Sequence, residues 1–110
     1  MNQQKLFETA KVFNFAEAIE YQSDAVVSRQ VMKNEKGNVS LFAFDAGQGL
    51  SEHTAPFDAL VQVIEGQAII TIDGRPHELS SGHSIIMPAH MPHALYAAQA
   101  FKMILTMIKA

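Results

Sequence analysis

The five histidines are the residues of this chain best suited to chemistry, and all of them fall within the stretch from Gly47 to His93. His53 follows a glycine-rich break, while His90 and His93 belong to the proline-rich segment PAHMPH. An imidazole ligates metal ions, donates and accepts hydrogen bonds, and carries a proton near neutral pH. His53, His90 and His93 are therefore candidates for a polar or metal-binding site.

Two interpretations of this site are open. In the first, the histidines ligate an ion, a task that usually takes three or four nitrogen, oxygen or sulfur ligands. In the second, His53 and His93 are pocket imidazoles that bond to each other, to Gln62 or to Tyr96. Asp58 can serve as a ligand to the ion only if a β-bulge turns it toward the interior.

The remaining residues offer no competing constellation. His77 comes soon after the Asp73-Gly74 turn and His83 directly follows Gly82, so both are expected to be solvated. There is no cysteine, which excludes disulfides and thiolate nucleophiles. The sequence also contains no nucleophile elbow and no glycine-rich phosphate loop ahead of a helix.

Composition places the chain among ordered single-domain proteins. Of its 110 residues, 48% are hydrophobic and 17% are charged, which is enough apolar material for one core. The net charge of −3 and the scattered Lys and Arg favour neither nucleic acid nor a membrane surface as partner. No apolar run reaches the ~18 residues of a membrane span, and no leader peptide is expected. Because there is no cysteine, a cytoplasmic location is predicted.

Short β-branched runs separated by turn residues dominate the chain. They cover 25–32, 39–45, 59–64, 67–72, 84–87, 93–97 and 101–108. Asp73-Gly74 has the composition of a two-residue hairpin turn, and Glu65-Gly66 is predicted to be another. About seven to nine short antiparallel strands with so little helix are typical of a sandwich or barrel.

The chain is expected to divide into an N-terminal arm (1–24) and a barrel domain (25–110). Asn14 followed three residues later by Glu17 resembles a capping box. We therefore expect one short helix or helical turn over 11–20, lying on the edge of the larger β structure.

Two predicted strands are apolar on both faces. Phe42 and Phe44 alternate with Leu41 and Ala43, and the run 101–108 is mostly apolar on both sides. A strand with one solvated face alternates apolar with polar residues, so the outer face of these strands must be covered. The arm is one candidate cover and a second copy of the chain is the other. We predict a homodimer, because one short helix is too small to cover the whole face.

The spacing of glycine, proline and histidine resembles the two motifs of the cupin superfamily. The matching positions are Gly47, His53 and Gly66 for the first motif, and Gly82, Pro88 and His93 for the second. The resemblance implies a small, single-domain, RmlC-like cupin. Its fold would be an all-β antiparallel double-stranded β-helix, that is, a jelly-roll barrel.

The resemblance also implies a metal site, from which this chain departs. Cupins that hold a metal usually present a further histidine and a glutamate where this sequence has Ala55 and Ala59. What remains is a partial site of His53 and His93, with His90 as the candidate third ligand. The implied cofactor is one divalent ion (Zn, Fe, Mn or Ni) or none.

These observations lead to one expected function and two alternatives. The expected function is the binding of a small molecule in the barrel, beside the partial metal site. The residues predicted to line this pocket, besides the three histidines, are Phe44, Val61, Val63, Met87 and Met103. One alternative is a metal-dependent enzyme of oxygenase, isomerase or decarboxylase type, and the other is a ligand-sensing or accessory dimer without catalysis.

Overall fold

The structure is a computed structural model that describes residues 7–109, and nine β-strands account for most of them. The strands are β1 (Val26–Asn34), β2 (Gly37–Phe44), β3 (Gly49–His53), β4 (Phe57–Glu65), β5 (Gln67–Ile72), β6 (Arg75–Ser80), β7 (Ser84–Met87), β8 (His93–Tyr96) and β9 (Phe101–Lys109). The predicted number of strands is thus confirmed. Over residues 7–109 the chain forms no helix, and so none that could cross a membrane.

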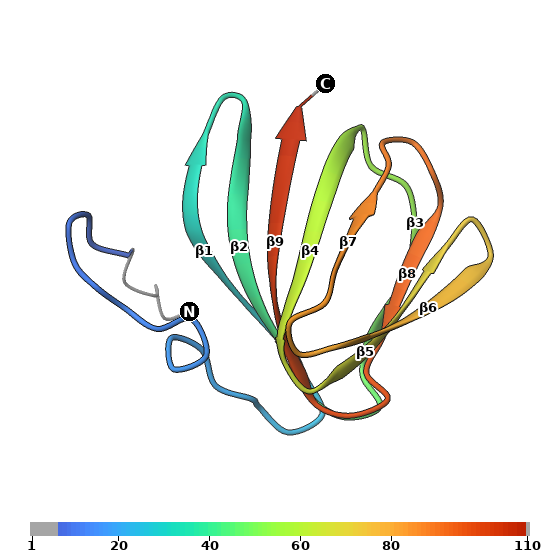
Figure 1. The fold of residues 1–110 in the computed structure, drawn as a ribbon, viewed down its shortest axis with the longest axis horizontal. Coiled ribbons are helices and arrows are strands. Elements are labelled where there is room, and N and C mark those ends of the chain that lie inside the picture. Colours follow the sequence, from blue (N-terminus) through green and yellow to red (C-terminus); the bar gives the residue numbers. More distant parts are fainter. Residues whose placement is uncertain (1–6, 110) are drawn as a thin grey trace.

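The strands form two antiparallel sheets that face each other (Figure 1). One sheet has five strands in the order β1-β2-β9-β4-β7, and the other has four in the order β3-β8-β5-β6. Within the described range, only β1–β2 and β5–β6 are hairpins, and every other connection crosses from one sheet to the other. This winding is a jelly roll, which confirms the predicted all-β antiparallel barrel.

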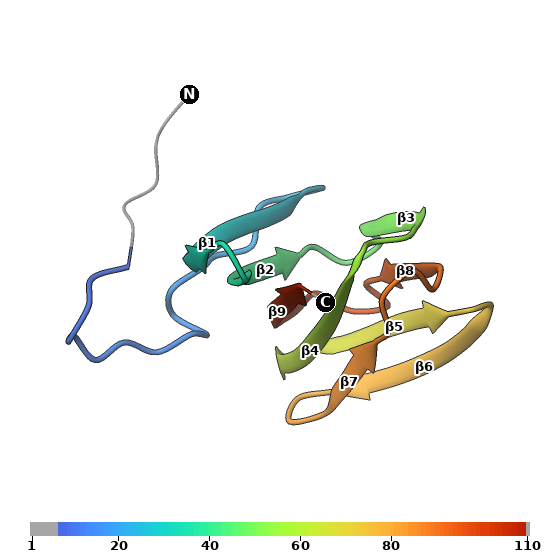
Figure 2. The same cartoon turned by 90° about the horizontal axis from the view of Figure 1, so that it is seen from above.

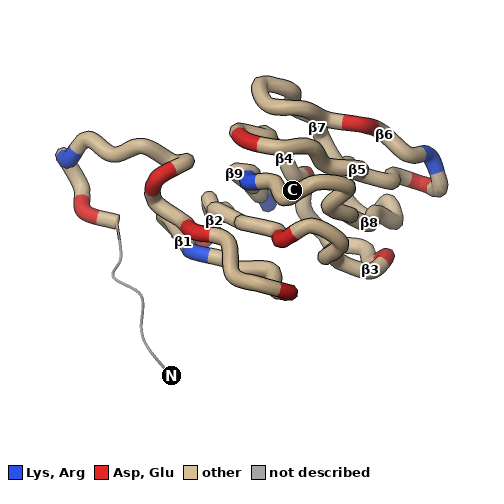
Figure 3. The backbone as a smooth tube through the Cα atoms, turned by 90° about the horizontal axis from the view of Figure 1, so that it is seen from below, with Lys and Arg blue, Asp and Glu red and all other residues tan. Residues whose placement is uncertain are grey.

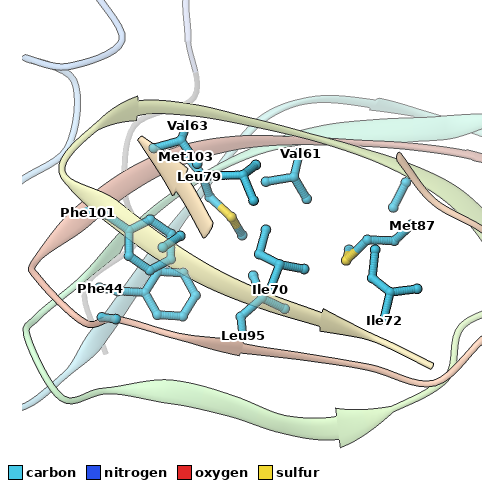
Figure 4. Packing of buried hydrophobic residues seen from close by; sticks show 13 residues of the cluster. Phe44, Val61, Val63, Ile70, Ile72, Leu79, Met87, Leu95, Phe101 and Met103 are labelled. Carbon is cyan, nitrogen blue, oxygen red and sulfur yellow. The ribbon is translucent and has the colours of Figure 1, made fainter. Parts of the chain in front are cut away.

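Apolar side chains from both sheets fill the space between them (Figure 4). Phe44 and Phe101, opposite each other on β2 and β9, stack with their ring centroids 4.4 Å apart. They mark one end of the core, and Ile72 and Met87 lie at the other end (Figure 4). Phe44 faces this core while its neighbour Ala43 faces away from it, as the two-sided apolar pattern predicts.

Glu65-Gly66 is a corner between the sheets, so its prediction as a hairpin turn is wrong. β4 belongs to the five-stranded sheet and β5 to the four-stranded sheet. Gly66 has a φ of +78°, which serves a corner as well as a hairpin, and the sequence does not distinguish the two. The Asp73-Gly74 hairpin is confirmed, because these residues have φ of +50° and +77° and join β5 to β6.

The N-terminal arm contains no helix in its described part, so of the two forms expected over 11–20 the helix is wrong and a single turn is present. Residues 15–18 form a turn, in which Ala18 N donates to the carbonyl of Phe15. The side chain of Asn14 accepts a hydrogen bond from Ala16 N at 2.9 Å. Asn side chains that bond locally in this way stabilise turns in competition with helices.

The arm lies on the outer face of the five-stranded sheet, away from the four-stranded sheet (Figure 2). Its Ile19 is buried against Leu41, Ala43 and Ile104, and together they form a second apolar cluster. The arm is therefore one cover of the outer face, as the sequence allows.

Two cationic side chains of the sheet hold the arm by its backbone. Lys102, only 8% exposed, donates through Nζ to the carbonyl of Ala16 at 2.5 Å. Arg29 donates through Nη1 to the carbonyl of Ala18 at 2.8 Å. Both hydrogen bonds are accepted by main-chain carbonyl oxygens. A turn, unlike a helix, does not pair all of its carbonyls internally.

Glu65 completes this anchor from the corner of the sheet. Its Oε2 lies 3.7 Å from the Lys102 ammonium and accepts a hydrogen bond of 2.5 Å from the hydroxyl of Tyr21. Burial of the phenol, this hydrogen bond and the negative charge of Glu65 all raise the pKa of Tyr21 above its ordinary value. The protonated phenol is thus favoured in the folded chain.

We expect Gly66→Ala to destabilise the fold far more than Gly74→Ala, although the two glycines have nearly equal φ, +78° and +77°. Both substitutions put a side chain in the left-handed region, which costs roughly 1–2 kcal/mol. A Cβ at Gly66 would also collide with the backbone of Ala100, whereas nothing lies within 4 Å of one at Gly74. Urea unfolding should show a loss of about 3 kcal/mol or more for Gly66→Ala. Equal losses of unfolding free energy in the two variants would contradict the close backbone contact at the Gly66 corner.

Tyr21→Phe should reduce the sensitivity of the fold to alkaline pH. Below about pH 10, the ordinary pKa of tyrosine, the phenol is protonated in both the folded and unfolded chains. Above it the unfolded chain releases this proton first, because the folded pKa is raised, so stability falls as pH rises. The melting temperature should therefore drop less in Tyr21→Phe than in the parent between about pH 9 and 11. Tyr96→Phe, on the other sheet, is the control, and parallel curves for Tyr21→Phe and the parent would refute the effect.

Candidate functional site

Three connections meet at one end of the barrel, and the predicted site residues lie there. Backbone hydrogen bonds tie these connections together. His90 N in the β7–β8 connection donates to Ala55 O in the β3–β4 connection at 2.8 Å. Asp73 N at the β5–β6 turn donates to Pro92 O, also at 2.8 Å. We call this the histidine end of the barrel.

Asp58 supports the histidine end from outside. Its Oδ1 accepts a 2.9 Å hydrogen bond from Ala89 N in the β7–β8 connection. β4 is paired regularly at this point, with Asp58 opposite Ile108 of β9, so no bulge turns the carboxylate inward. Asp58 therefore braces a loop and does not join the histidines.

His53 and His93 form a pair across β3 and β8. The two residues are direct partners in the sheet, and such partners point to the same face. Their ring centroids lie 4.3 Å apart and Nε2 of one lies 3.0 Å from Nε2 of the other. His93 is only 5% exposed, whereas His53 is exposed. The sequence allows these rings to contact each other, Gln62 or Tyr96, and in the structure they contact each other.

A β-bulge puts His53 in this position. Leu50 pairs with Leu95, and the next pair is His53 with His93, so β3 carries one residue more than β8 between them. Leu50 packs against the core, and without the extra residue Glu52 would stand opposite His93. Bulges redirect side chains in this way next to functional sites.

The hydrogen bonds of the two rings define where their protons lie. His53 Nδ1 is 2.7 Å from the carbonyl oxygen of Ser51, and His93 Nδ1 is 3.1 Å from that of Met91. A carbonyl only accepts, so each Nδ1 carries a proton and donates it. The contact between the two Nε2 atoms is then favourable only with a further proton or another cation between their lone pairs. The two Nε2 atoms therefore converge on a position that suits a shared proton or a cation.

The other histidines play different roles. His90 is exposed and has a φ of +66°, so it occupies a left-handed loop position. His83 is exposed, as predicted, and its Nδ1 accepts a 3.0 Å hydrogen bond from Ser80 N. His77 is half-buried and bonds through Nδ1 to Ile70 O at 3.1 Å, so its prediction as a solvated residue is wrong.

The five apolar residues predicted to line the pocket all belong to the packed core (Figure 4). They are Phe44, Val61, Val63, Met87 and Met103, each buried. Met87 lies at the same end of the core as Ile72 (Figure 4), and Ile72 is the β5 partner of His93. Ile72 and Met87 therefore lie at the histidine end of the core, whereas Phe44 lies at the opposite end (Figure 4). Contact of the five predicted residues with a ligand stays a prediction.

A divalent ion finds only part of its ligand set here. The two Nε2 atoms have free lone pairs that converge, which suits a metal. However, residues 7–109 contain no group of three or more His, Cys, Asp or Glu side chains that could hold an ion, and two nitrogens fall short of the usual three or four ligands. His90, the predicted third ligand, is therefore not brought into such a group, and the side chains described do not by themselves make a metal site.

A jelly roll with a histidine pair at one end defines a small barrel protein of the cupin class. The family model described as a cupin domain matches residues 40–109. The chain therefore belongs to the cupin family. A comparison with curated proteins finds no match.

Solved structures of bacterial proteins support this assignment over the whole chain. A conserved protein of unknown function from Streptococcus pyogenes is 35% identical with a TM-score of 0.91, and the match covers 100% of this chain and 96% of that one. A cupin superfamily protein from Desulfitobacterium hafniense is 27% identical with a TM-score of 0.89, over 99% and 100% of the two chains. A cupin 2 conserved barrel domain protein from Leptotrichia buccalis is 37% identical with a TM-score of 0.86, over 88% of this chain and 47% of that one.

Sequence reasoning missed the groups that orient the two rings. Each imidazole bonds to the carbonyl oxygen two residues before it, Ser51 for His53 and Met91 for His93. A backbone oxygen leaves no trace in side-chain type, so the sequence carries no signal for it. The bulge in β3 could not be predicted either, because no residue type between Leu50 and His53 indicates it.

The hydrogen bonds predict opposite tautomers for different histidines. His53 and His93 should be protonated at Nδ1, which faces a carbonyl, whereas neutral His83 should be protonated at Nε2, because its Nδ1 accepts from Ser80 N. Long-range ¹H–¹⁵N correlation spectra of the imidazoles distinguish these states. His83 is the internal control, and a bare Nδ1 on His53 and His93 would contradict the site geometry.

Proposed function

We propose that this cupin binds a small organic molecule whose polar or anionic head contacts the His53–His93 pair at the histidine end of the barrel. The observation that carries the proposal is the 3.0 Å contact between two Nε2 atoms whose rings are already held through Nδ1. A pair that shares an added proton carries one positive charge and suits an anionic group such as a carboxylate.

The surroundings of the pair support a ligand that is otherwise apolar. Ile72 and Met87 belong to the core at this end, and Met91 packs against that core. Small-molecule sites commonly combine such apolar walls with a few polar groups that orient the ligand. The proposal places the protein in the cytoplasm, which a chain without cysteine suits.

The two rings are suited to different parts in binding. His93 is buried and fixed between β3 and β5, so it provides a constant position for the head. His53 is exposed, and exposed side chains change rotamer on fast timescales. We expect His53 to turn from its neighbour toward the ligand, so that the head replaces one imidazole–imidazole contact.

A metal-dependent enzyme is the second candidate, favoured by one specific observation. The bonds from Nδ1 to backbone carbonyls are the support that metal-ligating histidines commonly have, and they leave both Nε2 atoms free. A substrate or water would have to supply the ligands that Ala55 and Ala59 do not. In the lead function the positive charge comes from a proton, and in this one from an ion.

The lead function is tested by ligand-dependent melting of tag-free protein. The probes are hexanoate and octanoate, with the matching alcohols as controls for the apolar tail. The carboxylates should raise the melting temperature more than the alcohols, by the linkage that gives about 2.7 kcal/mol at one hundred times the Kd. His53→Ala should remove the difference, whereas His83→Ala, in the β6–β7 turn, should keep it. Equal shifts for acids and alcohols would refute the anionic head.

Metal content of the same preparations separates the two candidates. The lead function expects far less than one ion per chain after incubation with Fe, Mn, Ni or Zn, measured by mass spectrometry. A metal content near one ion per chain that is lost in His53→Ala would favour the metal-dependent enzyme over the lead function. Loss in His90→Ala as well would make His90 the third ligand.

A further inference from the structure

Four residues form one row across the four-stranded sheet at the histidine end. Arg75 of β6 is opposite Ile72 of β5, and Ile72 is opposite His93 of β8. His93 is in turn opposite His53 of β3. Directly opposed residues share a face, and Ile72 belongs to the core between the two sheets. Arg75 is therefore on the inner face of its sheet, in the same row as the histidine pair.

The register sets the distance between the cation and the histidines in this row. Neighbouring strands lie about 4.7–4.9 Å apart, and one strand, β5, separates β6 from β8. The Cα atoms of Arg75 and His93 are therefore roughly 10 Å apart. Ile72, only 8% exposed, lies between them. A short apolar chain that lies over Ile72 thus has a polar protein group on either side.

Arg75 carries a positive charge that no described carboxylate neutralises. It is exposed, and among residues 7–109 its guanidinium forms no salt bridge and no hydrogen bond. The sequence contains no other lysine or arginine between Lys36 and Lys102. The blue segment at the tip of the β5–β6 hairpin accordingly lies apart from those at β1 and β9 (Figure 3). A guanidinium binds carboxylate and phosphate groups through two parallel hydrogen bonds.

The acidic residues of the β5–β6 hairpin leave this charge uncompensated. Glu78 is opposite Ile69 and lies an odd number of positions from Arg75 along β6, so its side chain is on the outer face of the sheet. Asp73 lies in the turn and forms no salt bridge with Arg75. The positive charge of Arg75 is therefore open to an anionic group of a ligand.

His77 adds a second polar group to the inner face of β6. It is opposite the fully buried Ile70 and is the next inward residue after Arg75 on this strand. The ring is half-buried, and its Nδ1 donates to the carbonyl oxygen of Ile70 at 3.1 Å, because a carbonyl only accepts. Its Nε2 has no hydrogen-bond partner among residues 7–109 and remains for a ligand. The inner face of β6 is thus polar next to the histidine end and apolar further along, at the buried Leu79.

We propose that Arg75, with His77 beside it, forms a second subsite of the ligand site, and that the ligand is a short dianion such as a dicarboxylate. The inference rests on the proposed function, which places one anionic head at the His53–His93 pair. Arg75 binds the second anionic group, and the apolar chain between the two groups lies over Ile72. Small-molecule sites obtain their specificity from a few polar groups placed around apolar walls. The two anionic ends therefore select both the length of the ligand and its direction along the row.

Calorimetric titration of tag-free protein with matched acids tests the second subsite. Adipate and suberate have the same carbon chains as hexanoate and octanoate but carry a second carboxylate. The parent should bind at least one dicarboxylate about tenfold more tightly than its monocarboxylate, the gain expected of one charge-assisted pair. Arg75→Gln should reduce this preference to less than about twofold. Lys33→Gln, which removes an exposed cation from β1 of the other sheet, should keep it.

The outcomes distinguish this inference from the function on which it rests. Hexanoate binding that depends on His53, but without a preference for either dicarboxylate, would overturn the second subsite and leave the proposed function in place. A preference that survives Arg75→Gln, or that is lost equally in Lys33→Gln, would also overturn it. Failure of all four acids to bind would overturn both. Arg75 is exposed beside a hairpin turn, so circular dichroism should show an intact fold for its variant.

Discussion

The covering of β9 on both sides is the constraint on which the rest of the structure depends. β9 is the middle strand of the five-stranded sheet and carries large apolar residues on each face. Phe101 and Met103 pack into the barrel, while Ile104 packs outward against the arm. A strand of this kind is stable only between two apolar layers. The second sheet supplies one layer, and the arm supplies part of the other.

The arm covers the outer face of the sheet although it has no regular secondary structure. Lys102 and Arg29 of the sheet donate to carbonyl oxygens of the arm. These ammonium and guanidinium groups replace the hydrogen bonds that a helix would make internally. Placing a lysine in so buried a position is costly unless it is paired. Glu65 and the Ala16 carbonyl provide that pairing. The chain thus covers apolar surface with a turn, at the expense of fixing two cations beneath it.

Much of the fold could be predicted from the sequence, because β-branched runs and two-sided apolar patterns indicate strands. Three features could not be predicted. Asn14 can start a helix or close a turn, and the structure has it in a turn, where its side chain accepts from Ala16 N and Arg29 of the sheet holds the Ala18 carbonyl. Gly66 permits a positive φ in either a hairpin or a corner, and the sheet to which each strand belongs is a long-range property. His53 could be chosen from its spacing, but its place opposite His93 depends on a bulge.

The orientation of the two imidazoles rests on main-chain atoms. Because the Ser51 and Met91 carbonyls hold the rings, the side chains at these positions do not determine the tautomers. A carboxylate in the same role would tie the site to a particular side chain and add a negative charge beside the pair. Here the orientation is inherited from the path of the backbone. Side chains around the histidines can therefore change while the geometry of the pair is preserved.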